Sequence, residues 1–251
     1  MIQPWTAHPA TFSEPVLQEI AKVPIAPGSR VLDPFAGTGK IHSFEQWDTW
    51  GVEIEPEGAV MHPRTIIGDA TNLPFSDGIF DAVVTSPVYG NRMSDHHEAK
   101  EICKACGGLG LVNREGESLP LVDLACEKCG GAGRRQWKRH TYRHSLPEDR
   151  PLHERNAGRM NWGPRYRDLH VQAWQEVWRV LRPGGCFVLN ISNHIRKHDE
   201  VDVVGWHADT ITKIGFTLSH RAPVKTRRNG QGANREARAE SEWLVTFLKL
   251  V

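Results

Sequence analysis

The sequence predicts an α/β protein whose core is a doubly wound, mostly parallel β-sheet, with a small metal-binding insert. Three observations support this prediction. Short apolar segments recur along the chain with helical or loop connections, as in parallel sheets. A glycine turn follows the first of them, at the position where open α/β sheets bind nucleotides. Four cysteines in two CxxC pairs then interrupt the regular pattern.

The first half of the core is expected to contain one helix and four strands. Residues 15–22 form a short amphipathic helix, which the segment PIAPG ends. The four strands lie within residues 29–40, 50–57, 65–75 and 80–90, each closed by a turn or by acidic residues. Short apolar strands with helical or loop connections indicate a parallel sheet.

The second half of the core begins where helical periodicity returns. Residues 168–181 place apolar side chains at helical spacing, and RPGG ends this helix before a fifth strand at residues 186–192. Residues 203–215 predict another helix. Residues 216–224 and 242–250 predict a closing antiparallel pair of strands.

These elements divide the chain into three segments. Residues 1–98 form the first part of the core and residues 161–251 the second part. Residues 99–160 form an insert that contains the cysteines and a basic stretch.

Composition and the first residues of the sequence indicate a protein of the cytoplasm. Hydrophobic residues make up 39% and charged residues 24% of the 251 residues, as in ordinary globular domains. No run approaches the ~20 apolar residues that cross a bilayer, and the sequence MIQPWTAHPATF does not resemble a secretion signal. We therefore expect no membrane association.

The net charge of +1 is unevenly distributed. Residues 1–81 contain 4 Lys/Arg and 11 Asp/Glu, whereas residues 134–170 contain 10 and 4, and residues 221–240 contain 6 and 2. Two basic stretches on a nearly neutral chain predict an anionic polymer as partner. A solvated, arginine-rich surface is the alternative.

The glycine turn and the acids at later strand ends predict a site for an adenosine-containing cofactor. Gly37 and Gly39 allow the backbone to approach a ligand closely. Glu53 lies at the end of the second strand, where its carboxylate can accept hydrogen bonds from the ribose hydroxyls. Asp69 follows the third strand, where it can accept a hydrogen bond from the adenine amino group. The predicted cofactor-binding residues are Asp33, Phe35, Ala36, Gly37, Thr38, Gly39, Glu53, Asp69, Ala70 and Ser86.

Four segments, VLDPFAGTGK, GVEIEPE, GDATNLPF and DAVVTSPVYG, resemble the cofactor-binding and catalytic motifs of the amino-group DNA methyltransferases, which act on cytosine N4 or adenine N6. The resemblance covers about residues 1–95 and 165–251. It implies the Rossmann-like fold of S-adenosylmethionine-dependent methyltransferases, S-adenosyl-L-methionine as cofactor and double-stranded DNA as partner. With this resemblance we expect a bacterial or phage-encoded protein. It leaves the oligomeric state and any accompanying nuclease undetermined.

The catalytic motif of that family is Asp/Asn/Ser-Pro-Pro-aromatic, and here it is Ser86-Pro87-Val88-Tyr89. The Ser86 side chain and the Pro87 carbonyl are suited to accept hydrogen bonds from the two N–H groups of an exocyclic amine. This arrangement directs the nitrogen lone pair toward the sulfonium methyl group. Tyr89 is suited to stack on a flipped base. Serine in first place favours cytosine N4 over adenine N6, and Val88 departs from the usual second proline.

The insert contains the spacing C-x2-C-x19-C-x2-C at Cys103, Cys106, Cys126 and Cys129. This spacing predicts a structural Zn²⁺ site with four thiolates, in a segment with little apolar surface of its own. Free thiol pairs or a redox disulfide are the alternatives. The two CxxCGGxG knuckles resemble half of the cysteine-rich region of DnaJ-type chaperones.

A basic stretch, RRQWKRHTYRH, follows the second knuckle. Basic and aromatic side chains that alternate in this way favour contact with phosphates and bases. The candidate nucleic-acid-binding residues are Arg134, Arg135, Trp137, Lys138, Arg139 and Arg143.

The sequence leaves two other functions open. One is methylation of an RNA base, for example at guanine N2. The other is a catalytically weak, DNA-binding relict of the methyltransferase fold.

Overall fold

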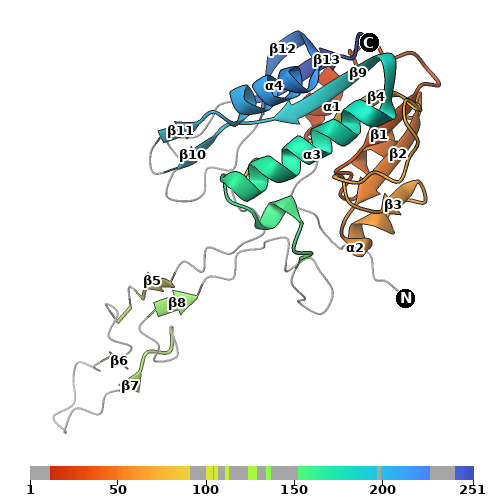
Figure 1. Cartoon of the computed structure of the whole chain (residues 1–251). Helices are drawn as coiled ribbons and strands as arrows, with labels where there is room; N and C mark the ends of the chain where they lie inside the picture. Colours follow the sequence, from red (N-terminus) through yellow and green to blue (C-terminus); the bar gives the residue numbers. More distant parts are fainter. Residues whose placement is uncertain are drawn as a thin grey trace, which may run out of the picture. The chain divides into compact units, whose positions relative to one another are not determined.

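A computed structural model describes residues 12–90, 100–103, 105–106, 111–112, 124–128, 134–136, 152–196, 199–226 and 241–251. The chain divides into two compact units (Figure 1). The core unit comprises Met1–Ser94 and Tyr142–Val251, and the insert unit comprises Asp95–Thr141.

A seven-stranded sheet with the order β12-β13-β9-β4-β1-β2-β3 forms the centre of the core unit. Five neighbouring strands run parallel, and β13 and β12 close one edge as an antiparallel pair. The strands are β1 (Arg30–Asp33), β2 (Asp48–Glu53), β3 (Thr65–Ile67), β4 (Phe80–Thr85), β9 (Leu181–Ile191), β12 (Thr217–Lys225) and β13 (Ser241–Leu248). The predicted doubly wound, mostly parallel sheet is therefore confirmed.

The predicted helices are present with small changes at their ends. They are α1 (Glu14–Ile20), α3 (Pro164–Val180) and α4 (Val203–Ile214). The structure adds three short elements that were not predicted, namely α2 (Pro56–Ala59) and the 3₁₀ turns η1 (Lys40–Ser43) and η4 (Ala157–Arg159). Helix α3 begins earlier than predicted, because proline is well tolerated in a first turn. Among the described helices, none has the length and apolar character that crossing a bilayer would require.

Both faces of the sheet are buried, because successive apolar side chains of a strand point to opposite faces. Leu32 and Val83 belong to the cluster that packs against α3 and α4, whereas Val31, Ala82 and Val84 belong to the cluster with α1. Accordingly, α3 and α4 cover one face of the sheet and α1 lies on the other (Figure 1). Trp174 of α3 is fully buried in the first cluster.

The order in which the strands are added to the sheet switches sides at β1. Strand β1 pairs with β2 on one side and with β4 on the other, both in parallel. In doubly wound sheets such a switch point opens a crevice at the carboxyl ends of the strands. The predicted cofactor-binding and catalytic motifs lie at the carboxyl ends of β1, β2, β3 and β4.

The segment that leaves the core after β4 is fastened to the segment that returns before α3. The carbonyl oxygen of Gly90 accepts a hydrogen bond from the Trp162 backbone N–H at 2.6 Å. Gly90 has a left-handed φ of 70°, and a side chain there would press against Trp162 and Tyr166. The hairpin of β10 (His194–Arg196) and β11 (Asp199–Val201) follows β9.

The described residues of the insert unit form two short antiparallel ladders. Strand β5 (Lys100–Ile102) pairs with β8 (Arg134–Gln136), and β6 (Leu111–Val112) pairs with β7 (Leu124–Ala125).

Candidate active site

A cavity of about 230 Å³ lies at the carboxyl ends of the parallel strands of the core unit. Nearly all residues predicted for cofactor binding and catalysis line it, namely Asp33, Phe35, Ala36, Gly37, Thr38, Glu53, Asp69, Ala70, Ser86, Pro87 and Tyr89. Gly39 is not among the lining residues. Its φ of 77° and its close approach to His42 and His62 give it a role in the turn itself.

The glycine turn is held by the acid at the end of β2. Glu53 Oε2 accepts the Gly37 backbone N–H at 2.8 Å, and Glu53 Oε1 accepts the Glu55 N–H at 2.9 Å. Gly37 has a left-handed φ of 55°, which glycine adopts without strain. Each carboxylate oxygen has a second lone pair, so Glu53 retains acceptor capacity toward a ligand.

Asp33 ends β1 beneath the same cavity. Its Oδ1 accepts the Thr85 hydroxyl at 2.6 Å and the Phe35 N–H at 3.0 Å, which joins the tips of β1 and β4. Burial raises the pKa of Asp33 from 3.8 to about 7, although both hydrogen bonds oppose the shift. Burial likewise raises the pKa of Glu53 from 4.5 to about 7. Both carboxyl groups therefore titrate near neutrality, which is typical of functional sites.

Asp69 is already engaged on both oxygens. Its Oδ1 accepts the backbone N–H and the hydroxyl of Thr71, and its Oδ2 lies 2.8 Å from Arg155 Nε. Arg155 also donates to the Thr71 hydroxyl. An adenine amino group at Asp69 would therefore share the carboxylate with Arg155 or displace it.

The segment that returns before α3 forms one wall of the cavity. Glu55 is fully buried, and its Oε1 accepts the His153 backbone N–H at 2.7 Å and the Asn156 Nδ2–H at 2.8 Å. Arg155, Asn156, Ala157 and Gly158 line the cavity. The sequence did not indicate this role, because these residues lie far from the glycine turn along the chain.

The tetrapeptide Ser86-Pro87-Val88-Tyr89 follows β4 and meets two side chains from later strands. Asn190 of β9 donates from Nδ2 to Ser86 Oγ at 3.1 Å and to Glu242 Oε2 at 2.8 Å. The Tyr89 hydroxyl donates to the same Glu242 oxygen at 3.3 Å. Glu242 lines the cavity. An acid at the start of an apolar strand was the signal that could have indicated it.

A buried chain of hydrogen bonds supports the tetrapeptide from behind. Trp174 Nε1–H donates to His207 Nδ1 at 3.0 Å, His207 Nε2 lies 3.0 Å from the Tyr166 hydroxyl, and that hydroxyl donates to the Val88 carbonyl at 2.8 Å. An indole N–H can only donate, so His207 carries its proton on Nε2 and donates to Tyr166. Burial lowers the pKa of His207 well below 6.5, consistent with this neutral form. The Val88 side chain packs against the cluster that includes Tyr166 and Leu169.

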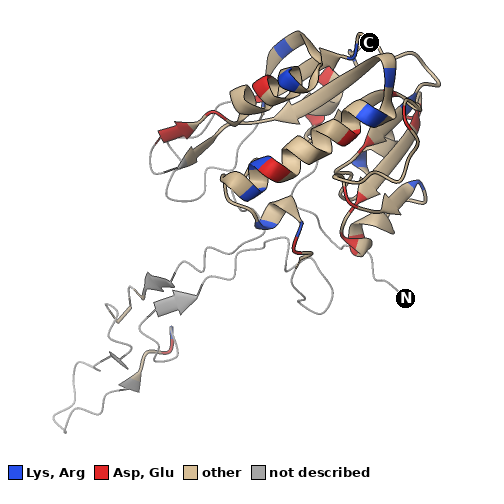
Figure 2. Ribbon diagram, in the orientation of Figure 1, with Lys and Arg blue, Asp and Glu red and all other residues tan. Residues whose placement is uncertain are grey.

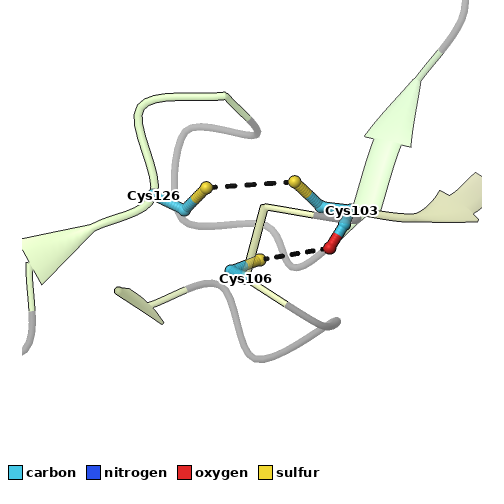
Figure 3. Close-up of side chains that lie close together, drawn as sticks. All are labelled: Cys103, Cys106 and Cys126. Carbon is cyan, nitrogen blue, oxygen red and sulfur yellow. Dashed lines mark hydrogen bonds between the residues drawn. The ribbon is translucent and has the colours of Figure 1, made fainter. Parts of the chain in front are cut away.

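Three of the four predicted metal ligands come together in the insert unit (Figure 3). The thiol groups of Cys103, Cys106 and Cys126 are buried, and their sulfur atoms lie within 4.8 Å of one another. Cys103 Sγ and Cys126 Sγ are 3.9 Å apart, close to the ~3.8 Å separation of two thiolates on a tetrahedral ion with ~2.3 Å bonds. Cys129 lies outside the described residues.

The structure describes little of the predicted nucleic-acid-binding stretch. Arg134 and Arg135 belong to strand β8 (Arg134–Gln136), of which the structure describes only the backbone. The other candidates lie outside the described residues, namely Trp137, Lys138, Arg139 and Arg143. In the core unit, Arg165 is exposed at the start of α3, and the Arg167 guanidinium lies over the Trp162 ring at 5.7 Å. Basic and acidic residues both occur along α3 (Figure 2).

Comparison with known sequences gives one partial relative. No family model matches the chain. A demethylmenaquinone methyltransferase of Mycolicibacterium paratuberculosis is 30% identical over 108 residues. That match covers 40% of this chain and 44% of the relative, so the chain spans less than half of the length of this curated protein.

Solved structures match over nearly the whole chain. A chain from the complex of the Haloferax volcanii Trm112 methyltransferase activator with a methyltransferase has a TM-score of 0.52 at 13% identity, covering 93% of this chain and 87% of that one. An S-adenosylmethionine-dependent methyltransferase from Methanosarcina mazei has a TM-score of 0.51 at 11% identity, covering 92% and 97%.

A third match, the [4+2]-cyclase SpnF, has a TM-score of 0.50 at 12% identity and covers 100% of this chain and 88% of that one. A cyclase on this architecture illustrates that fold similarity does not carry an activity with it. What the sheet order, the cavity at its switch point and these matches establish is architecture: the chain has the Rossmann-like fold of S-adenosylmethionine-dependent methyltransferases.

Proposed function

We propose that this protein transfers a methyl group from S-adenosyl-L-methionine to an exocyclic amino group of a base in double-stranded DNA, with cytosine N4 favoured over adenine N6. One observation carries the proposal. Gly37, Glu53 and Asp69 line the same cavity as Ser86, Pro87 and Tyr89. A methyl donor and an acceptor amine would therefore meet in one cavity.

The residues present fit the cofactor. Glu53 offers carboxylate lone pairs to ribose hydroxyls beside the glycine turn, and Asp69 offers an acceptor to the adenine amino group once Arg155 yields it. Phe35 and Ala36 supply apolar surface, as in other ligand pockets. When bound, this cofactor would supply an electrophilic methyl group on a positively charged sulfur.

The tetrapeptide supplies acceptors for the amine. Ser86 Oγ already accepts one hydrogen bond from Asn190, which fixes its position and leaves a lone pair for an amine N–H. The Pro87 carbonyl would accept the second N–H, and proline restricts the loop before the substrate arrives. Tyr89 would stack on the base, which must leave the duplex to reach the cavity.

The insert unit would bind zinc through Cys103, Cys106, Cys126 and Cys129. The three described sulfur atoms lie within 4.8 Å of one another, which supports a closed thiolate site. Such a site stabilises small segments and leaves no open position for catalysis. The basic stretch that follows, at residues 134–144, would bind the phosphates of the nucleic acid. Its five Lys/Arg and two aromatic residues support a polymeric, anionic substrate.

Methylation of a small molecule is a second candidate, because the partial relative is named a demethylmenaquinone methyltransferase. An RNA base is a third candidate, since the same cavity would receive it and the basic stretch would bind it equally well.

The decisive experiment is incubation of the purified chain with deuterium-labelled S-adenosylmethionine and mixed-sequence DNA, followed by nucleoside mass spectrometry. Labelled N4-methylcytosine or N6-methyladenine is the expected product. Parallel reactions contain RNA and a quinone precursor, and a Ser86→Ala/Tyr89→Ala variant is the matched control. Label in RNA or in the quinone alone would replace the DNA proposal with the corresponding alternative. Absence of binding to S-adenosylhomocysteine in calorimetry would refute methyl transfer altogether.

A further inference from the structure

Glu242 is the acidic residue that lies beside the tetrapeptide. It stands at the start of β13, next to β9 in the sheet, and lines the cavity. Its Oε2 accepts hydrogen bonds from Asn190 Nδ2 at 2.8 Å and from the Tyr89 hydroxyl at 3.3 Å. Its Oε1 receives no hydrogen bond from any residue that the structure describes.

The hydrogen bonds fix the orientation of the Asn190 amide. Because a carboxylate can only accept, the Asn190 atom that faces Glu242 is the NH₂ group, and the same group donates to Ser86 Oγ. Ser86 Oγ and Glu242 Oε2 therefore contact one nitrogen atom and flank the same position. Asn190 is 1% exposed, and its Oδ1 has no partner among the described residues.

The proposed reaction requires a proton acceptor that the predicted motif lacks. When the amine nitrogen gains a methyl group it becomes positively charged and must release a proton. A serine hydroxyl, a backbone carbonyl and a tyrosine hydroxyl are all poor bases at neutral pH. A carboxylate next to the amine can both stabilise the developing charge and take the proton.

The other acids of the cavity are committed elsewhere. Asp33 bonds to Thr85 and to the backbone at the base of the cavity. Glu53 holds the glycine turn, and Asp69 pairs with Arg155. Among the described residues, four carboxylates line the cavity, and of these Glu242 accepts a hydrogen bond from the Tyr89 side chain of the tetrapeptide.

We propose that Glu242 is a catalytic residue whose Oε1 accepts the proton of the amine as it is methylated. The inference rests on the proposed function and adds a residue to its site. The amine lone pair forms the N–CH₃ bond while the S–CH₃ bond breaks, and its electron pair stays on sulfur, which becomes a neutral thioether. The N–H electron pair stays on nitrogen, and the proton moves to Glu242, which later releases it to water.

The test is the Glu242→Gln variant under single-turnover conditions, with labelled S-adenosylmethionine and the nucleic acid that the wild-type protein methylates. Glutamine retains an oxygen that accepts from Asn190 and Tyr89 but has no negative charge and does not accept a proton. We expect the methyl-transfer rate to fall by about 10²- to 10⁴-fold, the range for loss of a general base. Affinity for S-adenosylhomocysteine, measured by calorimetry, should stay the same.

Glu200→Gln is the matched control, because Glu200 also accepts from an asparagine amide, that of Asn193 at 2.7 Å, yet lies outside the cavity. It should transfer methyl groups at the wild-type rate. Glu242→Asp keeps the charge and should recover much of the lost rate, which also tests the proposal should Glu242→Gln fold poorly.

The outcomes separate the two proposals. A wild-type protein that binds S-adenosylhomocysteine but methylates no amine overturns the proposed function, and the role of Glu242 with it. A wild-type protein that methylates while Glu242→Gln matches its rate overturns only the role of Glu242. The Glu242→Asp variant gives a second check. If Glu242→Gln keeps its affinity for S-adenosylhomocysteine and Glu242→Asp is equally slow, this result argues against proton transfer to a carboxylate at this position.

Discussion

Two buried carboxyl groups make the stability of the core unit depend on pH. Asp33 is 2% and Glu53 8% exposed, and burial raises the pKa of each to about 7 in the folded protein. Between about pH 4 and pH 7 the folded state therefore holds protons that the unfolded state has lost. Because the folded state binds more protons in this window, the free energy of unfolding should decrease as the pH rises through it.

Asp33→Asn tests this dependence at a single residue. The asparagine Oδ1 can accept the same hydrogen bonds from Thr85 and Phe35, since both fall on one oxygen of Asp33. We expect little difference from wild type at about pH 3, where the Asp33 side chain is protonated in both states, and a variant that is more stable by a few kcal/mol at pH 8, given that one pKa unit corresponds to about 1.4 kcal/mol. Thermal unfolding at intervals between these pH values measures the difference. A constant gap across the range would contradict the prediction.

At the scale of residues, the sequence predicted the members of the site that adjoin its motifs. Glu53 and Ser86 could be predicted because each ends an apolar strand next to a turn. Glu242 and Asn190 could not, since each meets the tetrapeptide only through the pairing of β13 with β9. Arg155 and Glu55 were missed for the same reason, because their partners are distant in sequence.

At the scale of elements, helices α3 and α4 position the tetrapeptide through Tyr166 and His207. Tyr166→Phe would leave the Val88 carbonyl and the His207 Nε2–H buried without partners, at a cost of about 1–3 kcal/mol. We expect a lower unfolding temperature, a lower kcat for methyl transfer and an unchanged affinity for S-adenosylhomocysteine. Denaturation, steady-state kinetics and calorimetry measure the three effects.

A variant with a similar loss of stability away from the tetrapeptide is the control for Tyr166→Phe. Ile211→Val shortens a fully buried side chain of α4 and should cost about 0.5–1.5 kcal/mol. Its kcat should remain at the wild-type value. If Tyr166→Phe also kept its full kcat, the hydrogen-bond chain would have only a structural role.

Element types could be predicted better than element ends. The alternation of apolar residues on β1 and β4, and the helical spacing in α3, leave little choice of secondary structure. The segment around η4 was assigned to the insert because it follows a basic, cysteine-rich stretch. It packs on the cavity instead, because Glu55 and Asp69 hold it.

At the scale of the whole molecule, the two units should respond separately to loss of metal. We expect about one zinc ion per chain in elemental analysis, as for a closed four-thiolate site. Cys103→Ser should abolish zinc binding and methylation of nucleic acid while S-adenosylhomocysteine affinity persists, because the cavity is lined by residues of the core unit.

Cys186→Ser is the comparison for that variant. Cys186 lies in β9, where burial raises the pKa of its thiol to about 11, so it should contribute nothing to metal binding. Its zinc content should equal that of the wild type. Full zinc content in Cys103→Ser would refute the proposed ligand set.

The backbone hydrogen bond between Gly90 and Trp162 has a consequence for how this molecule can change. It joins the backbone on either side of residues 91–161, and of these residues Arg155, Asn156, Ala157 and Gly158 line the cavity. Enlarging such a loop adds little entropic cost, since closure entropy grows only logarithmically. The stretch at 95–141 belongs to the insert unit and contributes no described residue to the cavity lining, so we expect changes in its length to leave the core unit folded.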